Sequence, residues 1–211
     1  MAQSDTDVTI CSEAIVILSA AALTSLTDGR VTDDACNRLY PDLKVHLLTV
    51  YPWTWTLKKV QLTKDTTDPV NEWDNAFDLP SDIIGSPIAV FDSSSSGIHP
   101  RRYGWELYGR STFDRGQLFT NLDTVYIDYQ HLISESLMPA YFVRLLRFAL
   151  AAEIAMVVTD QISKAEYYRN IAYGSPGEGG RGGLLREAMN IDGRGRPSEI
   201  IEDYTLVNAR Y

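Results

Sequence analysis

Six carboxylates lie within eighteen residues in the middle of the chain. Paired carboxylates can hydrolyse a glycosidic bond by acid–base chemistry, so one interpretation of segment 65–82 is an enzyme such as a cell-wall hydrolase. The other interpretation, which we favour, is a solvated loop face in an acidic protein. The carboxylates are Asp65, Asp68, Glu72, Asp74, Asp78 and Asp82.

Metal and cofactor chemistry finds little support in the sequence. The histidines, His46, His99 and His131, lack the spacing of metal ligands, and neither cysteine pairs with one in a finger-like pattern. The sequence contains no P-loop, nucleophile elbow or dinucleotide fingerprint. We therefore predict no catalytic residue, no metal site and no cofactor. We expect Cys11 and Cys36 to be buried, reduced thiols.

Basic side chains gather at Arg101 and Arg102, where aromatic residues are interleaved with them. Arginines beside aromatic rings are typical of contacts with a nucleic-acid backbone. The neighbouring acid Glu106 dilutes the positive charge, and a protein–protein contact is at least as well supported. Arg101 and Arg102 are accordingly candidates for a subunit interface.

The composition is that of a folded, acidic protein. The 211 residues include 19 Lys and Arg against 28 Asp and Glu, a net charge of −9, and 45% of them are apolar. This excludes a disordered chain and disfavours a general nucleic-acid binder. The longest apolar stretch, 139–158, carries three charged residues, and the N-terminus lacks the pattern of a targeting segment. We expect a protein made in the cytoplasm without a membrane anchor.

Apolar periodicity predicts three helical segments around the middle of the chain. The first spans residues 9–21 and the second 32–50, where Pro41 implies a kink or a break. The third spans 139–173, with a bend near Thr159. Because it is apolar nearly all round, it lies either at the centre of a bundle or at a subunit interface. The interface candidates on this helix are Phe142, Leu146, Ala149 and Ala152.

The middle third of the chain changes to the short, β-branched and aromatic pattern of strands. It predicts a small, mostly antiparallel sheet. The fold class expected from the sequence is therefore α+β, with a helical bundle formed by residues 1–52 and 139–173 and a β-rich insert over 53–131. The expected strands are 54–62, 76–79, 87–91, 105–108, 117–120 and 124–129.

The C-terminal segment, 174–211, combines a glycine-rich stretch with an apolar end. Eight of the 14 glycines lie in residues 174–195, which predicts a flexible tether. The apolar end is expected to be an arm that folds on a partner, and the alternative is an arm that packs on its own subunit. The arm residues are Ile200, Ile201, Tyr204, Leu206, Val207 and Tyr211.

Several stretches of residues 8–173 resemble a known family. They are CSEAIVILSAAALTSL, ACNRLYPDLKVHLLTVYPWTWTLKKVQL, NAFDLPSDII, VYIDY and RFALAAEIAMVVTDQISKAEYYRN. In this order they resemble the head-to-tail adaptors of tailed bacteriophages, also called tail tubular protein A. The chain has Phe77 where the family has Tyr, and Val157-Val158-Thr159 where the family has a Pro-Leu-Thr-like step.

The resemblance implies a structural virion protein without enzymatic activity. Members of the family form a ring, here expected to contain twelve copies, between the portal protein and the next tail component. The ring extends the channel through which DNA passes, without specific binding, when the genome is retained or ejected. The resemblance also implies that the C-terminal arm reaches the portal and that the protein, assembled in the cytoplasm of a bacterial host, resides at the head–tail junction.

Overall fold

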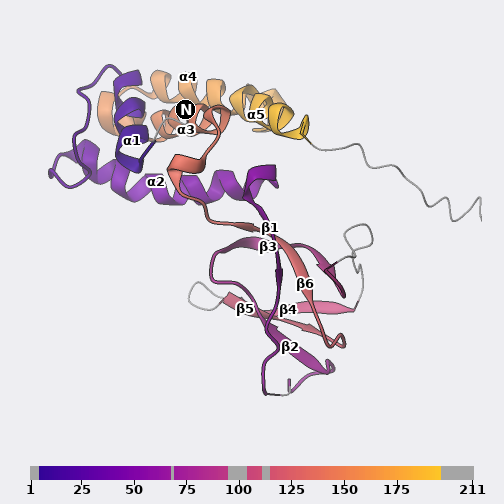
Figure 1. Cartoon of the computed structure of the whole chain (residues 1–211). Helices are drawn as coiled ribbons and strands as arrows, with labels where there is room; N and C mark the ends of the chain where they lie inside the picture. The colour runs from indigo at the N-terminus through magenta and orange to yellow at the C-terminus, as the bar shows by residue number, and fades with distance from the viewer. Residues whose placement is uncertain (1–4, 68, 95–103, 111–114, 196–211) are drawn as a thin grey trace, which may run out of the picture.

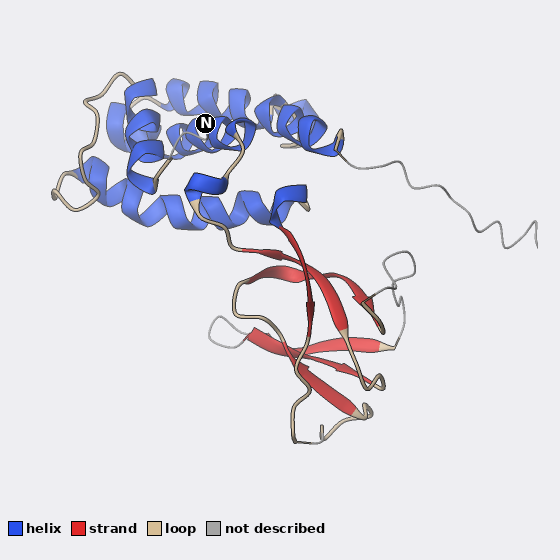
Figure 2. Ribbon diagram, viewed as in Figure 1, coloured by secondary structure: helices blue, strands red, loops and turns tan. Residues whose placement is uncertain are grey.

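The computed structural model describes residues 5–67, 69–94, 104–110 and 115–195, and these form an α+β fold (Figures 1 and 2). The fold class predicted from the sequence is confirmed. Helices gather in one part of the molecule and strands in the other. The helices are α1 (Asp7–Ile17), α2 (Val31–Val50), α3 (Ala140–Thr159), α4 (Ile162–Tyr173) and α5 (Gly183–Gly193). The strands are β1 (Leu57–Gln61), β2 (Asn75–Asp78), β3 (Ile83–Phe91), β4 (Trp105–Arg110), β5 (Arg115–Thr120) and β6 (Tyr126–His131).

Helix α3 is the centre of the helical part. It contacts α1, α2, α4 and α5, and nine of its 20 residues are buried. Its alanines leave little side-chain bulk, so the surrounding helices can approach closely. Of the two positions that the sequence left open for this helix, the structure shows the centre of a bundle.

The helix ends follow local chemistry. Thr6 caps α1, because its hydroxyl accepts the Thr9 N–H at 3.2 Å while the Thr9 hydroxyl accepts the Thr6 N–H. Of the kink or break expected at Pro41, the break is absent, since α2 continues from Val31 to Val50. Pro41 is exposed, so water can reach the backbone carbonyl that loses its N–H partner there.

The long C-terminal helix expected from the sequence is two helices. Asp160 ends α3 in a left-handed conformation, with φ of 53°, and α4 begins at Ile162. The bend expected near Thr159 is therefore confirmed as a sharper corner, which we call the elbow (residues 156–162).

The glycine-rich stretch does not behave as a tether. Residues 183–193 form α5, and Leu184, Leu185 and Ala188 of this helix are buried against α3 and α4. The glycines before it permit a close backbone approach. A Cβ on Gly183 would collide with the Ile171 carbonyl oxygen and lie 2.8 Å from the Gly174 nitrogen. The expected tether over 174–195 is wrong, because these glycines fix the α4–α5 turn.

We predict that Gly183→Ala lowers the free energy of unfolding by about 2–3 kcal/mol. Its φ of +53° strains any side chain, and the added Cβ meets backbone that cannot move aside. Gly177→Ala is the matched control, because its Cβ meets only the Ser175 hydroxyl at 4.0 Å. Urea unfolding of both variants checks the prediction. Equal stability of the two variants would contradict it.

The strands form two antiparallel sheets of three strands rather than the single sheet expected. Their orders are β1-β6-β3 and β2-β5-β4. The chain passes between them after β1, where the Leu62 N–H donates to the Val125 carbonyl and Lys64 bridges to Phe77. The two sheets enclose a second hydrophobic core. It consists of Leu62, Phe77, Leu79, Val90, Leu118, Val125, Ile127 and Tyr129.

Trp53 anchors the strands to the helices. The indole is fully buried, and its N–H donates to the Leu47 carbonyl oxygen at 3.0 Å. Its ring lies 5.1 Å from Phe142 of α3 and 5.0 Å from Tyr51 at the end of α2, edge-on in both cases. Such aromatic contacts add to the burial of large apolar surface, so the end of α2 is fixed on the start of α3.

Two buried polar side chains complete this junction. The Gln130 amide of β6 donates to the carbonyls of Leu48 and Tyr51, both at 3.0 Å. Asp192, near the end of α5, accepts the Thr54 N–H at 3.0 Å and the Tyr141 hydroxyl at 2.8 Å. Because each group bonds across elements far apart in sequence, the two parts of the molecule have one fixed arrangement.

Candidate functional site

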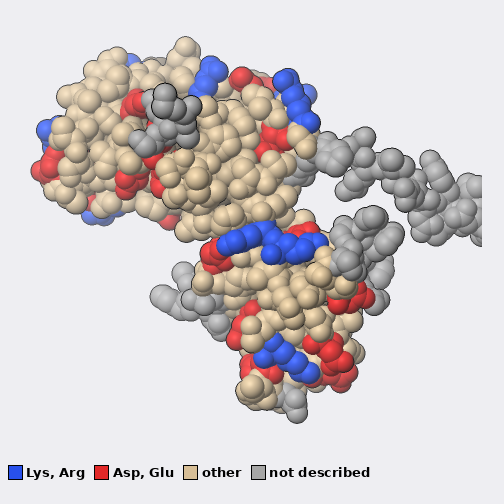
Figure 3. Space-filling view, in the orientation of Figure 1, with Lys and Arg blue, Asp and Glu red and all other residues tan. Residues whose placement is uncertain are grey.

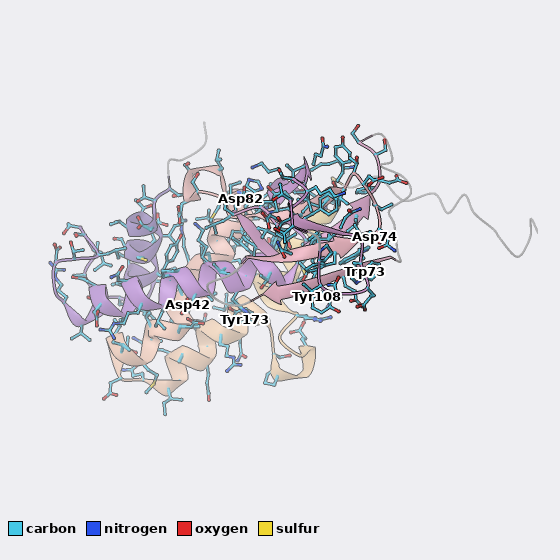
Figure 4. The ribbon with its side chains drawn as sticks, turned by 90° about the horizontal axis from the view of Figure 1, so that it is seen from below. Asp42, Trp73, Asp74, Asp82, Tyr108 and Tyr173 are labelled. Carbon is cyan, nitrogen blue, oxygen red and sulfur yellow. The ribbon has the colours of Figure 1, made fainter. Side chains whose placement is uncertain are left out.

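The outer face of sheet β2-β5-β4 carries the side chains best placed to meet another molecule. Glu106 and Tyr108 alternate on β4 with residues of the second core, so both point away from it. Phe119 of β5 lies opposite Glu106, and Gln117 lies opposite Tyr108. With Trp73, from the loop before β2, these residues form what we call the aromatic–acidic face. Figure 4 shows Trp73 and Tyr108 on the β part.

Glu106 is held between two aromatic donors. Its Oε2 accepts the Tyr108 hydroxyl at 2.7 Å and the Trp73 indole N–H at 3.2 Å. These two bonds lower the pKa of the Glu106 carboxyl, and the same carboxylate raises the pKa of Tyr108. The Tyr108 ring stands edge-on to Phe119 at 5.2 Å and is 45% exposed. The face thus holds an ionised carboxylate beside an accessible ring.

A pair of carboxylates lies on the same face. The Gln117 amide donates to Asp65 Oδ2 at 2.9 Å and to Asp78 Oδ1 at 3.0 Å. The backbone N–H of Thr67, followed by this Gln117 bond, lowers the pKa of Asp65. One neutral amide therefore bridges two carboxylates, and no shared proton is needed to keep them together.

The five described carboxylates of segment 65–82 do not form one cluster in the structure. Asp65 and Asp78 meet through Gln117, while Glu72 and Asp74 are exposed in the segment before β2. Asp82 directly precedes β3 and accepts hydrogen bonds from Lys58 of β1 and Tyr129 of β6. Asp68 lies outside the described residues. Figure 3 shows acidic side chains around the half of the β part that lies farther from the helices.

Asp65 and Asp82 lack the raised pKa that the general acid of a glycoside hydrolase needs, because the pKa of each carboxyl is lowered. A raised carboxyl pKa occurs instead at Glu153 of α3, where desolvation raises it, His46 opposes the rise and Asp42 adds to it. Glu153 belongs to the helical part, far along the fold from segment 65–82 (Figure 4 marks Asp42 and Asp82).

The helical part contains a small cavity between α3 and α5, with a volume of about 230 Å³. At its rim Arg144 and Glu187 form an exposed ion pair at 3.9 Å. The cavity is lined by Ala140, Tyr141, Arg144, Leu184, Glu187 and Ala188.

The histidines and cysteines have structural surroundings where they are described. His46 is exposed, the ring of His131 bonds to the Thr56 carbonyl at 2.8 Å, and His99 lies outside the described residues. Cys11 and Cys36 are buried free thiols, as expected. Within the described ranges, no group of three His, Cys, Asp or Glu side chains could hold a metal ion. None of the helices described is long and apolar enough to span a membrane.

Three of the subunit-interface candidates are wrong. Phe142, Leu146 and Ala149 are fully buried within one chain, because α3 uses these side chains to pack against its own neighbouring helices. Ala152 is half-buried. Arg101 and Arg102 lie outside the described residues, as does every candidate of the C-terminal arm.

Five of the exposed apolar side chains lie near the two ends of α3. At the elbow, Met156 is 42% exposed, Val157 48% and Ile162 64%. In the connection between β6 and α3, Leu132 is 49% exposed and Leu137 65%. We call these the elbow patch and the connector patch. The sequence did not reveal them, because periodicity marks a residue as apolar without showing which neighbour covers it.

The comparisons with known proteins give no identification. No family model matches the chain, and no curated protein matches it either.

We predict that Asp82→Asn lowers the free energy of unfolding by about 1 kcal/mol at pH 7. Burial opposes ionisation of Asp82, but the bonds from Lys58 (3.1 Å) and Tyr129 (3.0 Å) lower its pKa on balance. A lowered folded-state pKa stabilises the protein above the ordinary value of about 3.9, and this stabilisation is lost as the pH falls through the folded pKa.

The difference between the parent protein and the variant should therefore shrink below about pH 3.9. Urea unfolding at pH 7 and in steps to pH 3 measures it. Asp123→Asn is the control, because the Asp123 side chain is 94% exposed and lies 3.8 Å from Lys64. A difference in the free energy of unfolding that stays constant down to pH 3 would contradict the lowered pKa of Asp82.

Proposed function

We propose that this protein is a structural adaptor of a tailed-phage virion, which forms a ring of twelve copies between the portal and the tail. The proposal begins with the resemblance over residues 8–173. The single structural observation that supports it most is the pair of apolar patches at opposite ends of α3. No enzymatic activity is part of the proposal, and the lowered pKa values of Asp65 and Asp82 agree with that.

A closed ring needs two different surfaces on each subunit, one for each neighbour. The elbow patch and the connector patch differ in residues, and the 20 residues of α3 separate them by about 30 Å. A two-fold dimer would instead need one self-complementary patch. Ile162 and Leu137 are the most exposed side chains of the two patches. Covering them with an adjoining copy would therefore remove the most apolar surface from water and contribute most to the free energy of association.

The proposed ring would surround the DNA channel, and the net charge of −9 suits that place. Negative side chains on a channel wall repel the phosphates, so DNA can pass without adhering. The portal and the next tail component are the proposed partners on either side of the ring, and the protein would reside at the head–tail junction of the virion.

We predict that Ile162→Lys and Leu137→Lys each abolish the ring. Each places a charge where an apolar contact forms, which should weaken association at least about tenfold. Native mass spectrometry measures the assembly. Ile88→Lys, at a site on β3 that is 48% exposed, is the matched control and should still form rings.

Mixing the two variants makes the test specific to a head-to-tail contact. The mixture contains one intact elbow patch and one intact connector patch, so it should form heterodimers that cannot grow into rings. A parent protein that stays monomeric at high concentration would overturn the proposal. The proposal would also be overturned if the parent protein formed homodimers and both variants changed that assembly in the same way.

We further predict that removing residues 198–211 prevents attachment to the portal and leaves the subunit folded. Because α5 is packed in the bundle, the segment 196–211 can reach at most about 50 Å from its end. Ordering an arm of this length nearly offsets the burial of its apolar side chains, so firm attachment needs many arms acting together.

Co-sedimentation with DNA-filled, tail-less capsids measures this attachment, and circular dichroism checks the fold of the truncated chain. The full chain is the control in both. Normal co-sedimentation of the truncated protein, or its unfolding, would show that the arm packs on its own subunit.

A further inference from the structure

The aromatic–acidic face has a geometry that the ring does not explain. It lies on sheet β2-β5-β4, whereas both apolar patches lie at the ends of α3. Glu106 is exposed on this face together with Tyr108, and Trp73 is partly exposed.

The Glu106 carboxylate is prepared for a positive partner. Its hydrogen bonds from Tyr108 and Trp73 hold it in one orientation and lower its pKa, so it is ionised at neutral pH. Both donors are neutral, so neither cancels the negative charge. Glu72, whose charge also raises the pKa of Tyr108, adds negative potential beside the ring.

The two rings add a second mode of recognition. A cation gains electrostatic attraction when it sits over the face of a tryptophan or tyrosine ring. Among protein side chains, the arginine guanidinium satisfies both requirements, because it is planar, can stack on a ring and can pair with a carboxylate through its fork of donors. A lysine ammonium is more strongly hydrated and cannot stack.

We propose that the aromatic–acidic face binds an arginine side chain on a segment of a partner protein, with Glu106 pairing to the guanidinium and Tyr108 and Trp73 flanking it. Asp65 and Asp78, bridged by Gln117 along the same face, extend the negative surface for further basic residues of that segment. This site stands on its own geometry and does not depend on the proposed ring.

The test titrates full-length protein labelled with ¹⁵N with the peptide acetyl-Gly-Arg-Gly-amide and follows the indole N–H signal of Trp73. The matched ligand has citrulline in place of arginine, which keeps the shape and removes the charge. A third peptide has lysine in place of arginine. We expect saturable shifts with the arginine peptide, and about tenfold weaker binding of the citrulline and lysine peptides.

Three variants locate the site. Glu106→Gln and Tyr108→Ala should each weaken arginine binding about tenfold, the first through the lost charge and the second through the lost ring. Asp34→Asn, an exposed carboxylate on α2, should leave binding unchanged and controls for net charge. The spectrum of each variant reports whether it is folded.

Three outcomes would overturn the proposal. Equal binding of the arginine and citrulline peptides, or unchanged binding by folded Glu106→Gln and Tyr108→Ala, would remove the charge-based site. A shift of the same signals by methyl β-glucoside, without any shift by the arginine peptide, would assign the face to a sugar instead.

Discussion

A largely apolar helix that needs neighbours over much of its surface organises this molecule. Nine of the 20 residues of helix α3 are buried. An isolated helix of this kind would expose a large apolar surface to water, which is unfavourable. Every other helix of the described chain lies against it. Its corner at Asp160 returns the chain as α4, and the turn at Gly174–Gly183 returns it once more as α5. The glycines of this turn therefore allow α5 to pack against α3.

Contacts made by the same helix also orient the strands relative to the helices. Phe142 near its start contacts Trp53 and Trp55, and Tyr141 bonds to Asp192 of α5. Gln130 then ties β6 to the end of α2. These contacts are buried and directional, so a displacement of the sheets would leave polar groups without partners at a cost of about 1–3 kcal/mol each. The two parts are therefore joined by specific buried contacts as well as by the chain itself.

Much of the fold could be predicted from local patterns, because period-two and period-3.6 repeats are properties of a single segment. All six expected strands exist, and the corner after Thr159 lies where a bend was expected. Residues 183–193 were missed because glycine content records backbone freedom, not the close approach of Gly183 to Ile171. Burial of Phe142 and Leu146 was likewise invisible, since an apolar side chain packs equally well inside a subunit or between two.

The candidate site was hidden for a related reason. Glu106 and Tyr108 share a face of β4 by simple alternation, but Trp73 is 33 residues away from Glu106 and joins them only through the pairing of β2, β5 and β4. The carboxylates that crowd the sequence, by contrast, separate in space. Proximity along the chain raised hydrolysis only as the alternative to a solvated loop face. In the fold, hydrogen bonds lower the pKa of the Asp65 and Asp82 carboxyls.

A rigid junction gives the two proposed contact regions a common frame. The elbow and connector patches lie at the ends of α3, and the aromatic–acidic face lies on the sheet that is farther from the helices. If neighbouring copies fix α3, the buried bonds of Trp53, Gln130 and Asp192 also fix the direction in which every aromatic–acidic face points. Repeated around a ring, a weak arginine site would then act many times in register, and its effective concentration rather than its single-site affinity would set the strength of attachment.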